Sequence, residues 1–217
     1  MSPNNTALSL VVAVTSATSL LDLNKTPSLV RAIHDLQKYW PGQAITIAVD
    51  STNESAVWEV MKKNGITQEL VICDPNQPKV LAKVLLPIMG DCAALLIHDA
   101  SRPLTSPDLF SRIMAAFNHG ADAVRPAIAF TETLKVVGAN SVIEKNLDRT
   151  QVKRISTPEL IRISAIDPGG EDQGWFVPLK REAHIEYVEG NPESLRINSI
   201  AERDLLESFL HWKETNA

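Results

Sequence analysis

The chain has 217 residues, of which 44% are hydrophobic and 22% charged, and its formal net charge is −5 at pH 7. This length suits one domain with a substantial core, and the composition is that of an ordinary globular protein. The negative charge argues against a nucleic-acid-binding protein. Its two cysteines, Cys73 and Cys92, form no CxxC pair, which argues against a disulfide framework and a zinc site.

Nothing in the sequence has the pattern of a membrane span or a secretion signal. The apolar run at residues 7–14 is too short to cross a bilayer, and no basic segment precedes it. We therefore expect a cytoplasmic protein that does not bind a membrane.

Short apolar runs alternate with amphipathic patterns over the first 130 residues. Runs of strand length, rich in β-branched residues, cover 8–14, 44–49, 69–73, 93–97 and 122–128. Apolar residues recur at helical spacing over 26–39, 54–63 and 79–89, and a fourth helix begins at Ser106-Pro107-Asp108 with a cap, a first-turn proline and an acid. This alternation predicts an α/β fold: a Rossmann-like, mostly parallel sheet with helices on both faces.

The pattern changes after residue 130. Residues 133–157 contain short β-rich pieces around a Gly-Ala-Asn-Ser turn, which predicts a protruding β-arm rather than another strand–helix unit. Residues 166–174 are typical of a loop, and 184–190 of a strand. A capping box at residues 199–202 begins a C-terminal helix. We expect one domain over residues 1–217, with the arm at 133–157.

A candidate functional site follows the predicted strand at 93–97. Asp99 comes where that strand ends, and ligands of parallel α/β sheets bind beyond the carboxyl ends of the strands. A carboxylate there can hold a divalent ion that carries phosphate oxygens, and Arg102 offers a planar guanidinium for phosphate. The same spacing also fits a purely structural pair, in which Asp99 caps the turn and binds Arg102. We expect His98 to orient this loop rather than to act as a base.

The segment around Asp99 resembles a known family of enzymes. Residues 97–110, IHDASRPLTSPDLF, closely resemble a motif of the 2-C-methyl-D-erythritol 4-phosphate cytidylyltransferases, which act in the non-mevalonate isoprenoid route. Three later segments resemble family segments in the same order: GADAVRPAIAFTETLKVV, LDRTQVKRISTPEL and VEGNPESLRINS. The resemblance covers most of the chain from about residue 7 and is most specific in the middle.

This resemblance implies a fold, a reaction and a set of residues. Family members are homodimers with a nucleotide-diphospho-sugar transferase type of core, and a β-arm reaches into the neighbouring subunit. They transfer CMP from CTP to methylerythritol phosphate with Mg²⁺ assistance and release pyrophosphate. By this resemblance, Asp99 matches the metal-binding acid and Arg102 the arginine of the same motif. Thr133, Arg149 and Thr157 match residues on the side of the site that binds the methylerythritol phosphate.

The nucleotide-binding half of the family pattern is missing here. In the family, the first strand leads into a glycine-rich loop whose backbone N–H groups and cations hold the triphosphate. This chain has AVTSATSLLDLNKTPSLV instead, with no glycine between Met1 and Gly42. Lys25 is the single cation of that stretch and the candidate substitute for the loop lysine. After Cys73, DPNQPKVLAKV replaces the glycines that shape the cytosine pocket.

Two further candidates lie near residue 195. Arg196 stands where the family has a lysine, which keeps the charge but changes its geometry. Glu193 is a candidate second metal carboxylate near Asp99.

Three functions remain open. The chain is an active cytidylyltransferase that needs Mg²⁺, or a non-catalytic relative that binds a small phosphorylated metabolite or pairs with an active homologue, or an enzyme with a different nucleotide or phosphosugar donor. Loss of one preorganised donor costs about 2.7–4 kcal/mol of transition-state stabilisation, and here a whole loop of donors is missing. We therefore favour the non-catalytic relative, a homodimer through the arm.

Overall fold

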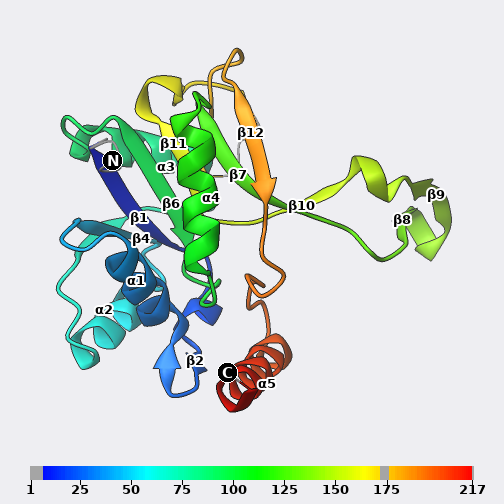
Figure 1. Cartoon of the computed structure of the whole chain (residues 1–217), viewed down its shortest axis with the longest axis horizontal. Helices are drawn as coiled ribbons and strands as arrows, with labels where there is room; N and C mark the ends of the chain where they lie inside the picture. Colours follow the sequence, from blue (N-terminus) through cyan, green and yellow to red (C-terminus); the bar gives the residue numbers. More distant parts are fainter. Residues whose placement is uncertain (1–6, 172–175, 217) are drawn as a thin grey trace.

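The computed structural model describes residues 7–171 and 176–216. An eight-stranded sheet has the order β10-β7-β11-β6-β1-β4-β5, and β12 pairs with β7 (Figure 1). Its strands are β1 (Leu8–Val14), β4 (Ile45–Val49), β5 (Glu69–Ile72), β6 (Ala94–Asp99), β7 (Ala123–Ala129), β10 (Lys153–Ile155), β11 (Glu159–Arg162) and β12 (Ile185–Glu189). Four strand pairs are parallel and three antiparallel, so the predicted α/β fold with a mostly parallel sheet is confirmed.

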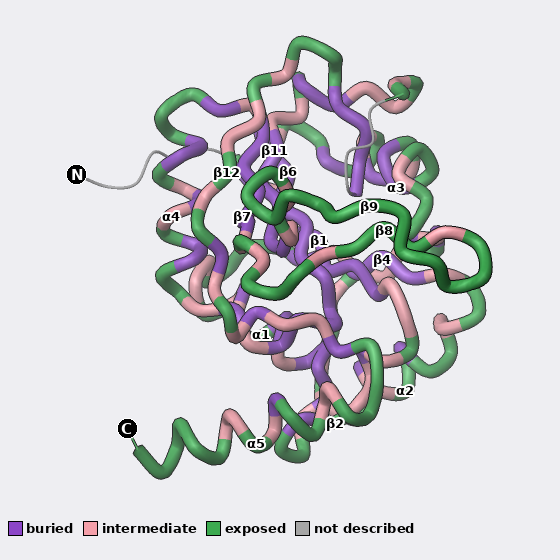
Figure 2. The backbone as a smooth tube through the Cα atoms, turned by 90° about the vertical axis from the view of Figure 1, so that its right-hand side faces the viewer, coloured by how far each residue is buried: buried purple, intermediate pink, exposed green. Residues whose placement is uncertain are grey.

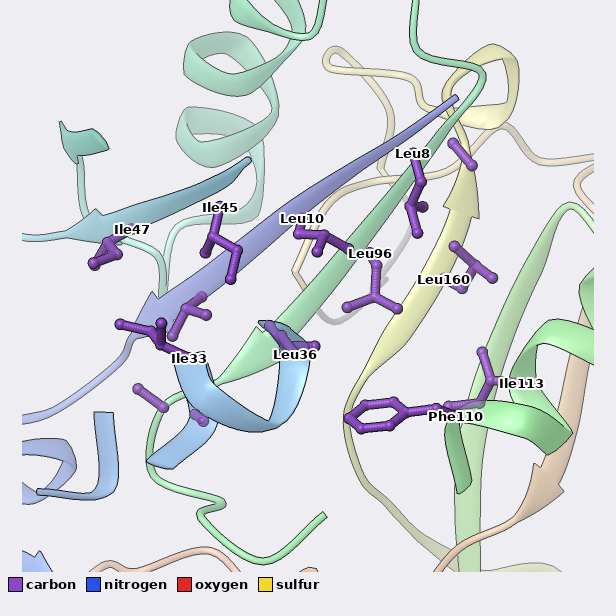
Figure 3. Packing of buried hydrophobic residues seen from close by; sticks show 14 of the residues in the cluster. Leu8, Leu10, Ile33, Leu36, Ile45, Ile47, Leu96, Phe110, Ile113 and Leu160 are labelled. Atoms are coloured by element: carbon purple, nitrogen blue, oxygen red, sulfur yellow. The ribbon is translucent and has the colours of Figure 1, made fainter. Parts of the chain in front are cut away.

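Helices cover both faces of the sheet, as the sequence predicts. On one face, Leu10 of β1 packs in a cluster with side chains of α1 (Ser28–Tyr39), α2 (Glu54–Lys63) and α4 (Pro107–Asn118), among them Phe110 (Figure 3). On the other face, Val11 belongs to a second cluster that includes residues of α3 (Pro78–Leu85). Because both faces of β1 are buried, every residue of the strand except Ser9 is apolar, and polar residues do not alternate along it.

Two predicted helices begin or end elsewhere than expected. The helix predicted from residue 26 starts at Ser28, because β3 (Thr26–Pro27) pairs with β2 (Asp22–Leu23) in a short hairpin. The helix predicted to reach residue 89 ends at Leu85, and a 3₁₀ turn (Leu86–Ile88) follows. Pro87 lies in that turn and has no N–H to continue an α-helix.

Strand β11 is not among the predicted strands. It lies antiparallel between β6 and β7, with Leu160 opposite Leu96 on one side and Val124 on the other. Four residues between two loops carry little pattern of their own, and burial on both faces of the sheet supplies the stability. The loop predicted at 166–174 extends into residues 172–174, which lie outside the described residues.

The predicted arm is a hairpin that projects away from the sheet (Figure 1). It consists of β8 (Leu134–Val137) and β9 (Ile143–Leu147), joined by a turn in which Asn140 and Ser141 have φ values of 62° and 61°. Most of its residues are exposed (Figure 2), including Val137 and Ile143, whose exposed fractions are 56% and 61%. The chain then returns to the sheet through β10.

The C-terminal helix α5 (Ile200–Asn216) begins with the predicted cap. The hydroxyl of Ser199 accepts the backbone N–H of Glu202 at 3.2 Å, whereas the Glu202 carboxylate accepts the N–H of Asn198 at 2.7 Å, one residue before the expected donor. Leu206 of this helix packs against Leu23 and Ile197. Within the described part of the chain, no helix is both long and apolar enough to cross a membrane.

Candidate functional site

The candidate site lies where β1 and β6 end side by side. The two strands are parallel neighbours, with Ala13 opposite Asp99, so Thr15 follows β1 next to the end of β6. The hydroxyl of Thr15 donates to Oδ1 of Asp99 at 3.0 Å. The rule that polar groups gather at the carboxyl ends of parallel strands therefore applies to this pair.

The carboxylate of Asp99 is almost fully buried, with 2% of the residue exposed. Its Oδ1 also accepts the backbone N–H of Ser101 at 2.9 Å, which is the turn-capping contact that the spacing allows. Its Oδ2 accepts the Nε of Arg196 at 2.9 Å, and the Nε of Arg102 lies farther off, at 3.9 Å. Asp99 is thus bound by three groups of the chain itself, and Arg196, 97 residues away, is its nearer cation.

Arg102 points into the protein. Only 5% of it is exposed, and its Nη1 donates to the backbone carbonyl of Ser194 at 2.7 Å. Burial lowers the pKa of Arg102 to about 10. The carboxylate of Asp99 raises this pKa, whereas the positive charges of Arg196 and Arg154 lower it further. The guanidinium is still charged at neutral pH, and it ties the loop after β6 to the segment that carries Arg196.

His98 fixes the same loop through hydrogen bonds of its two ring nitrogens. Its Nε2 lies 3.1 Å from the backbone carbonyl of Arg102, which can only accept, so Nε2 carries the proton and donates. In the neutral ring Nδ1 therefore accepts from the hydroxyl of Thr157 at 3.0 Å, and that hydroxyl also accepts the backbone N–H of Asp99 at 3.1 Å. Burial lowers the pKa of His98 to about 4, so the ring is neutral at pH 7. This geometry agrees with the orienting role expected for His98.

The residues expected to bind the substrate have different surroundings. Thr157 is fully buried, and its hydroxyl is engaged by His98 and by the backbone of Asp99. Thr133 and Arg149 are exposed at the base of the arm, where the Arg149 guanidinium donates to the carbonyl of Thr131. Two of the three therefore face solvent, while the third supports the loop.

Lys25 and Glu193 lie at other places than Asp99. Lys25 is exposed in the turn between β2 and β3, where the N–H of its neighbour Asn24 donates to Glu207 of α5 at 2.8 Å. Glu193 lines a cavity with Asp35, His34 and Phe209, among others. The cavity beside Asp99 is a different one, of about 320 Å³, and its lining residues are Thr15, Pro75, Asn76, Asp99, Phe176 and Arg196.

The side chains of the segment after β1 form hydrogen bonds with other parts of the chain. Residues Ala17–Leu20 form a 3₁₀ turn. The hydroxyl of Thr18 donates to the carbonyl of Ile197 at 2.6 Å, and the hydroxyls of Ser19 and Ser101 lie 3.0 Å apart. The hydroxyls of Thr18 and Ser19 are therefore hydrogen-bonded within the chain.

Asn76 also lines the cavity beside Asp99. Its side-chain amide donates to the carbonyl of Thr15 at 3.0 Å, and Asp74 fixes it by accepting its backbone N–H at 2.9 Å. Sequence reasoning missed both Thr15 and Asn76 as individual site residues. The sequence does contain a clue to Thr15, because this residue follows the strand that neighbours β6. It contains no clue that the side chain of Asn76 contacts the residue after β1.

Comparison with known proteins identifies the relatives of this chain. The family model of 2-C-methyl-D-erythritol 4-phosphate cytidylyltransferase (IspD) matches residues 12–174. A protein of that name from Frankia casuarinae is 24% identical over 204 residues, which is 88% of this chain and 73% of the relative. Its namesake from Rhodococcus jostii is 25% identical and matches 89% of this chain and 88% of the relative.

Other relatives match over less of their length. The protein of the same name from Nocardia farcinica is 33% identical over 127 residues, covering 55% of this chain and 54% of that protein. The match to a bifunctional IspD/IspF enzyme of Oleidesulfovibrio alaskensis covers 25% of that enzyme.

Solved structures share the fold. The crystal structure of 4-diphosphocytidyl-2C-methyl-D-erythritol synthase from Anaerococcus prevotii superposes with a TM-score of 0.72 at 15% identity, over 94% of this chain and 98% of that one. The cytidylyltransferase structure from Thermus thermophilus gives 0.70 at 14% identity, over 93% and 98% of the two chains.

Proposed function

This chain belongs to the 2-C-methyl-D-erythritol 4-phosphate cytidylyltransferase family, and we propose that it is a member that binds a small phosphate ester and pairs through its arm, with cytidylyl transfer weak or lost.

The closed segment after β1 carries the proposal. In this chain the residues that follow β1 have side chains where the family pattern has glycines, and a Cβ keeps a backbone N–H farther from a phosphate. The hydroxyls of Thr18 and Ser19 are bonded to Ile197 and Ser101. A triphosphate would have to break these contacts, and it would find no cation among residues 15–24. We therefore expect the nucleotide to bind weakly and its transfer to be slow.

The acceptor side offers more to a ligand. Thr133 and Arg149 match the family pattern and are exposed at the base of the arm, so a phosphate ester can reach both. A guanidinium binds phosphate through two parallel hydrogen bonds. The carbonyl of Thr131, which now accepts from Arg149, orients this guanidinium.

The arm supports pairing with a second copy. Val137 and Ile143 face each other across the hairpin and are more than half exposed. An exposed apolar ladder on a two-stranded hairpin is poorly stable alone and is typical of an interface. We therefore propose a homodimer in which the arm contacts the partner.

Calorimetric titration tests the proposed function. Methylerythritol phosphate should bind the wild type saturably, lose most of its affinity in Arg149→Ala, and keep it in Arg181→Ala, which removes an exposed arginine of the body. CTP with Mg²⁺ should give no saturable heat, and pyrophosphate release from the mixture should stay at background. Turnover at rates typical of enzymes, or the absence of methylerythritol phosphate binding, would contradict the proposal.

A further inference from the structure

Arg196 and Thr15 bind the buried carboxylate of Asp99 at both of its oxygens. Three groups form a closed ring: Arg196 donates from Nε to Oδ2 of Asp99 at 2.9 Å and from Nη2 to the hydroxyl of Thr15 at 2.8 Å, and Thr15 donates to Oδ1 of Asp99 at 3.0 Å. The third nitrogen of the guanidinium, Nη1, donates to the side chain of Asn198. The ring thus places a full positive charge on the buried carboxylate.

The residues at this place do not fit a resident Mg²⁺. That ion requires near-ideal octahedral coordination by oxygen, with one or two carboxylates and substrate phosphates. Both oxygens of Asp99 already accept hydrogen bonds from the chain, and Glu193 lines another cavity. Across residues 7–171 and 176–216, no group of three or more His, Cys, Asp or Glu side chains is placed to hold a metal ion.

We infer that Arg196 takes the place of the divalent cation at Asp99, so that this corner of the protein is neutralised by the chain itself and does not bind Mg²⁺. Arg102 adds a second guanidinium 3.9 Å from the same carboxylate. One acid and two arginines leave one positive charge in excess, so the cavity favours an anion without a metal bridge. Arg196 lines that cavity with 28% of its side chain exposed, and it meets an entering anion directly.

Removal of Arg196 should create the metal site that the wild type lacks. In Arg196→Gln, the buried carboxylate of Asp99 loses its nearer cation and the hydrogen bond to Oδ2, and only Arg102 remains, at 3.9 Å. A Mg²⁺ ion can then take the place of the lost guanidinium at Oδ2. We expect the Tm of this variant to fall by about 5 °C in EDTA. Millimolar Mg²⁺ should restore about 3 °C of the loss, because a ligand that binds only the folded state stabilises it.

Three other proteins serve as controls. The wild type and Arg203→Gln should show no Mg²⁺-dependent change; Arg203 has the same exposed fraction, 28%, but its partner Asp204 is well exposed. The double variant Asp99→Asn/Arg196→Gln should also not respond, because the charge that attracts the ion is gone. A rise in the wild-type Tm with Mg²⁺ that Asp99→Asn abolishes would overturn the inference, and so would a folded Arg196→Gln that ignores Mg²⁺.

A direct measurement on the wild type covers the case in which Arg196→Gln does not fold. Electron paramagnetic resonance of Mn²⁺ should show only the free ion when the wild type is added. Saturable loss of that signal that Asp99→Asn prevents would contradict the inference. These tests use metal ions alone, so their outcome is separate from the methylerythritol phosphate titration and its dependence on Arg149.

Discussion

Arg125 and Glu159 form an ion pair inside the sheet, between β7 and β11, with 9% and 0% of their side chains exposed. The register places them opposite each other, because Leu160 pairs with Val124 in this antiparallel ladder. Burial alone would lower the pKa of Arg125, but the nearby Glu159 carboxylate raises it above its ordinary value. Each charge thus depends on the other, and the acid lies on the strand that the sequence did not predict.

Removing one partner of this pair should lower the free energy of unfolding, whereas replacing both partners with apolar residues should not. Arg125→Met or Glu159→Leu alone removes the ion-pair partner of a buried charge and should lower the free energy of unfolding by about 3–5 kcal/mol. The double variant should lie near the wild type, because neither charge then remains. Urea denaturation of the four proteins measures the coupling, and a double variant as unstable as the sum of the single ones would show that the charges act independently.

The buried ring of His98 should make the protein sensitive to acid. Its pKa is about 4 in the folded state and 6.5 ordinarily, so the unfolded chain binds more protons between these values. The stability that comes from burying the neutral ring is complete above pH 6.5 and is lost as the pH falls toward 4. The loss amounts to about 3 kcal/mol, from 1.36 kcal/mol for each pKa unit.

Denaturation curves between pH 4 and 7 test this dependence. The variant His98→Gln should show a flatter slope of unfolding free energy against pH in this window, whatever its absolute stability. An unchanged slope would mean that His98 does not titrate there.

Asp35 of α1 should have the opposite effect in the same window. Burial raises the pKa of Asp35 to about 6, and the nearby charges of Arg31 and Lys38 only partly compensate. The folded state therefore holds a proton that the unfolded state releases above pH 3.8, and stability falls as the pH rises from 3.8 to 6. At pH 7 the charged form is buried at a cost, so Asp35→Asn should be more stable by about 3 kcal/mol.

The two titrations partly cancel in the wild type. Asp35→Asn removes the stabilisation that grows as the pH falls, so its unfolding free energy should decrease more steeply between pH 6 and 4 than that of the wild type. Parallel curves for the two proteins would contradict the raised pKa of Asp35.

The arm should determine the oligomeric state without affecting the stability of the core. Val137→Asp/Ile143→Asp places two charges on exposed positions of the hairpin, so the chain should become monomeric if the arm is the interface. The corresponding control is Val80→Asp, which places a charge on an exposed valine of α3 and leaves the hairpin unchanged. Sedimentation velocity distinguishes the two states, and a dimer that survives the double substitution would exclude the arm as its interface.

The local pattern predicted the parts of the fold that each segment specifies by itself. The apolar run at 8–14 matches β1, and the cap at Ser106 is present, with its hydroxyl accepting the N–H of Leu109 at 3.4 Å. The arm, too, lies where turn residues interrupt short β-rich pieces. Strand β11 escaped prediction because its four residues gain their stability from the strands on either side.

The amino-acid sequence by itself determined the family, the alternation of strands and helices, and the position of Asp99 at the end of a buried strand. It could not determine which cation lies on that carboxylate. Arg102 is three residues away, and the spacing allows it to pair with Asp99, but its guanidinium turns inward to the carbonyl of Ser194. Arg196 is 97 residues away and binds Asp99 at 2.9 Å. Only the tertiary structure decides this, because a buried charge is paired by whichever group the packing of distant segments brings within hydrogen-bond distance.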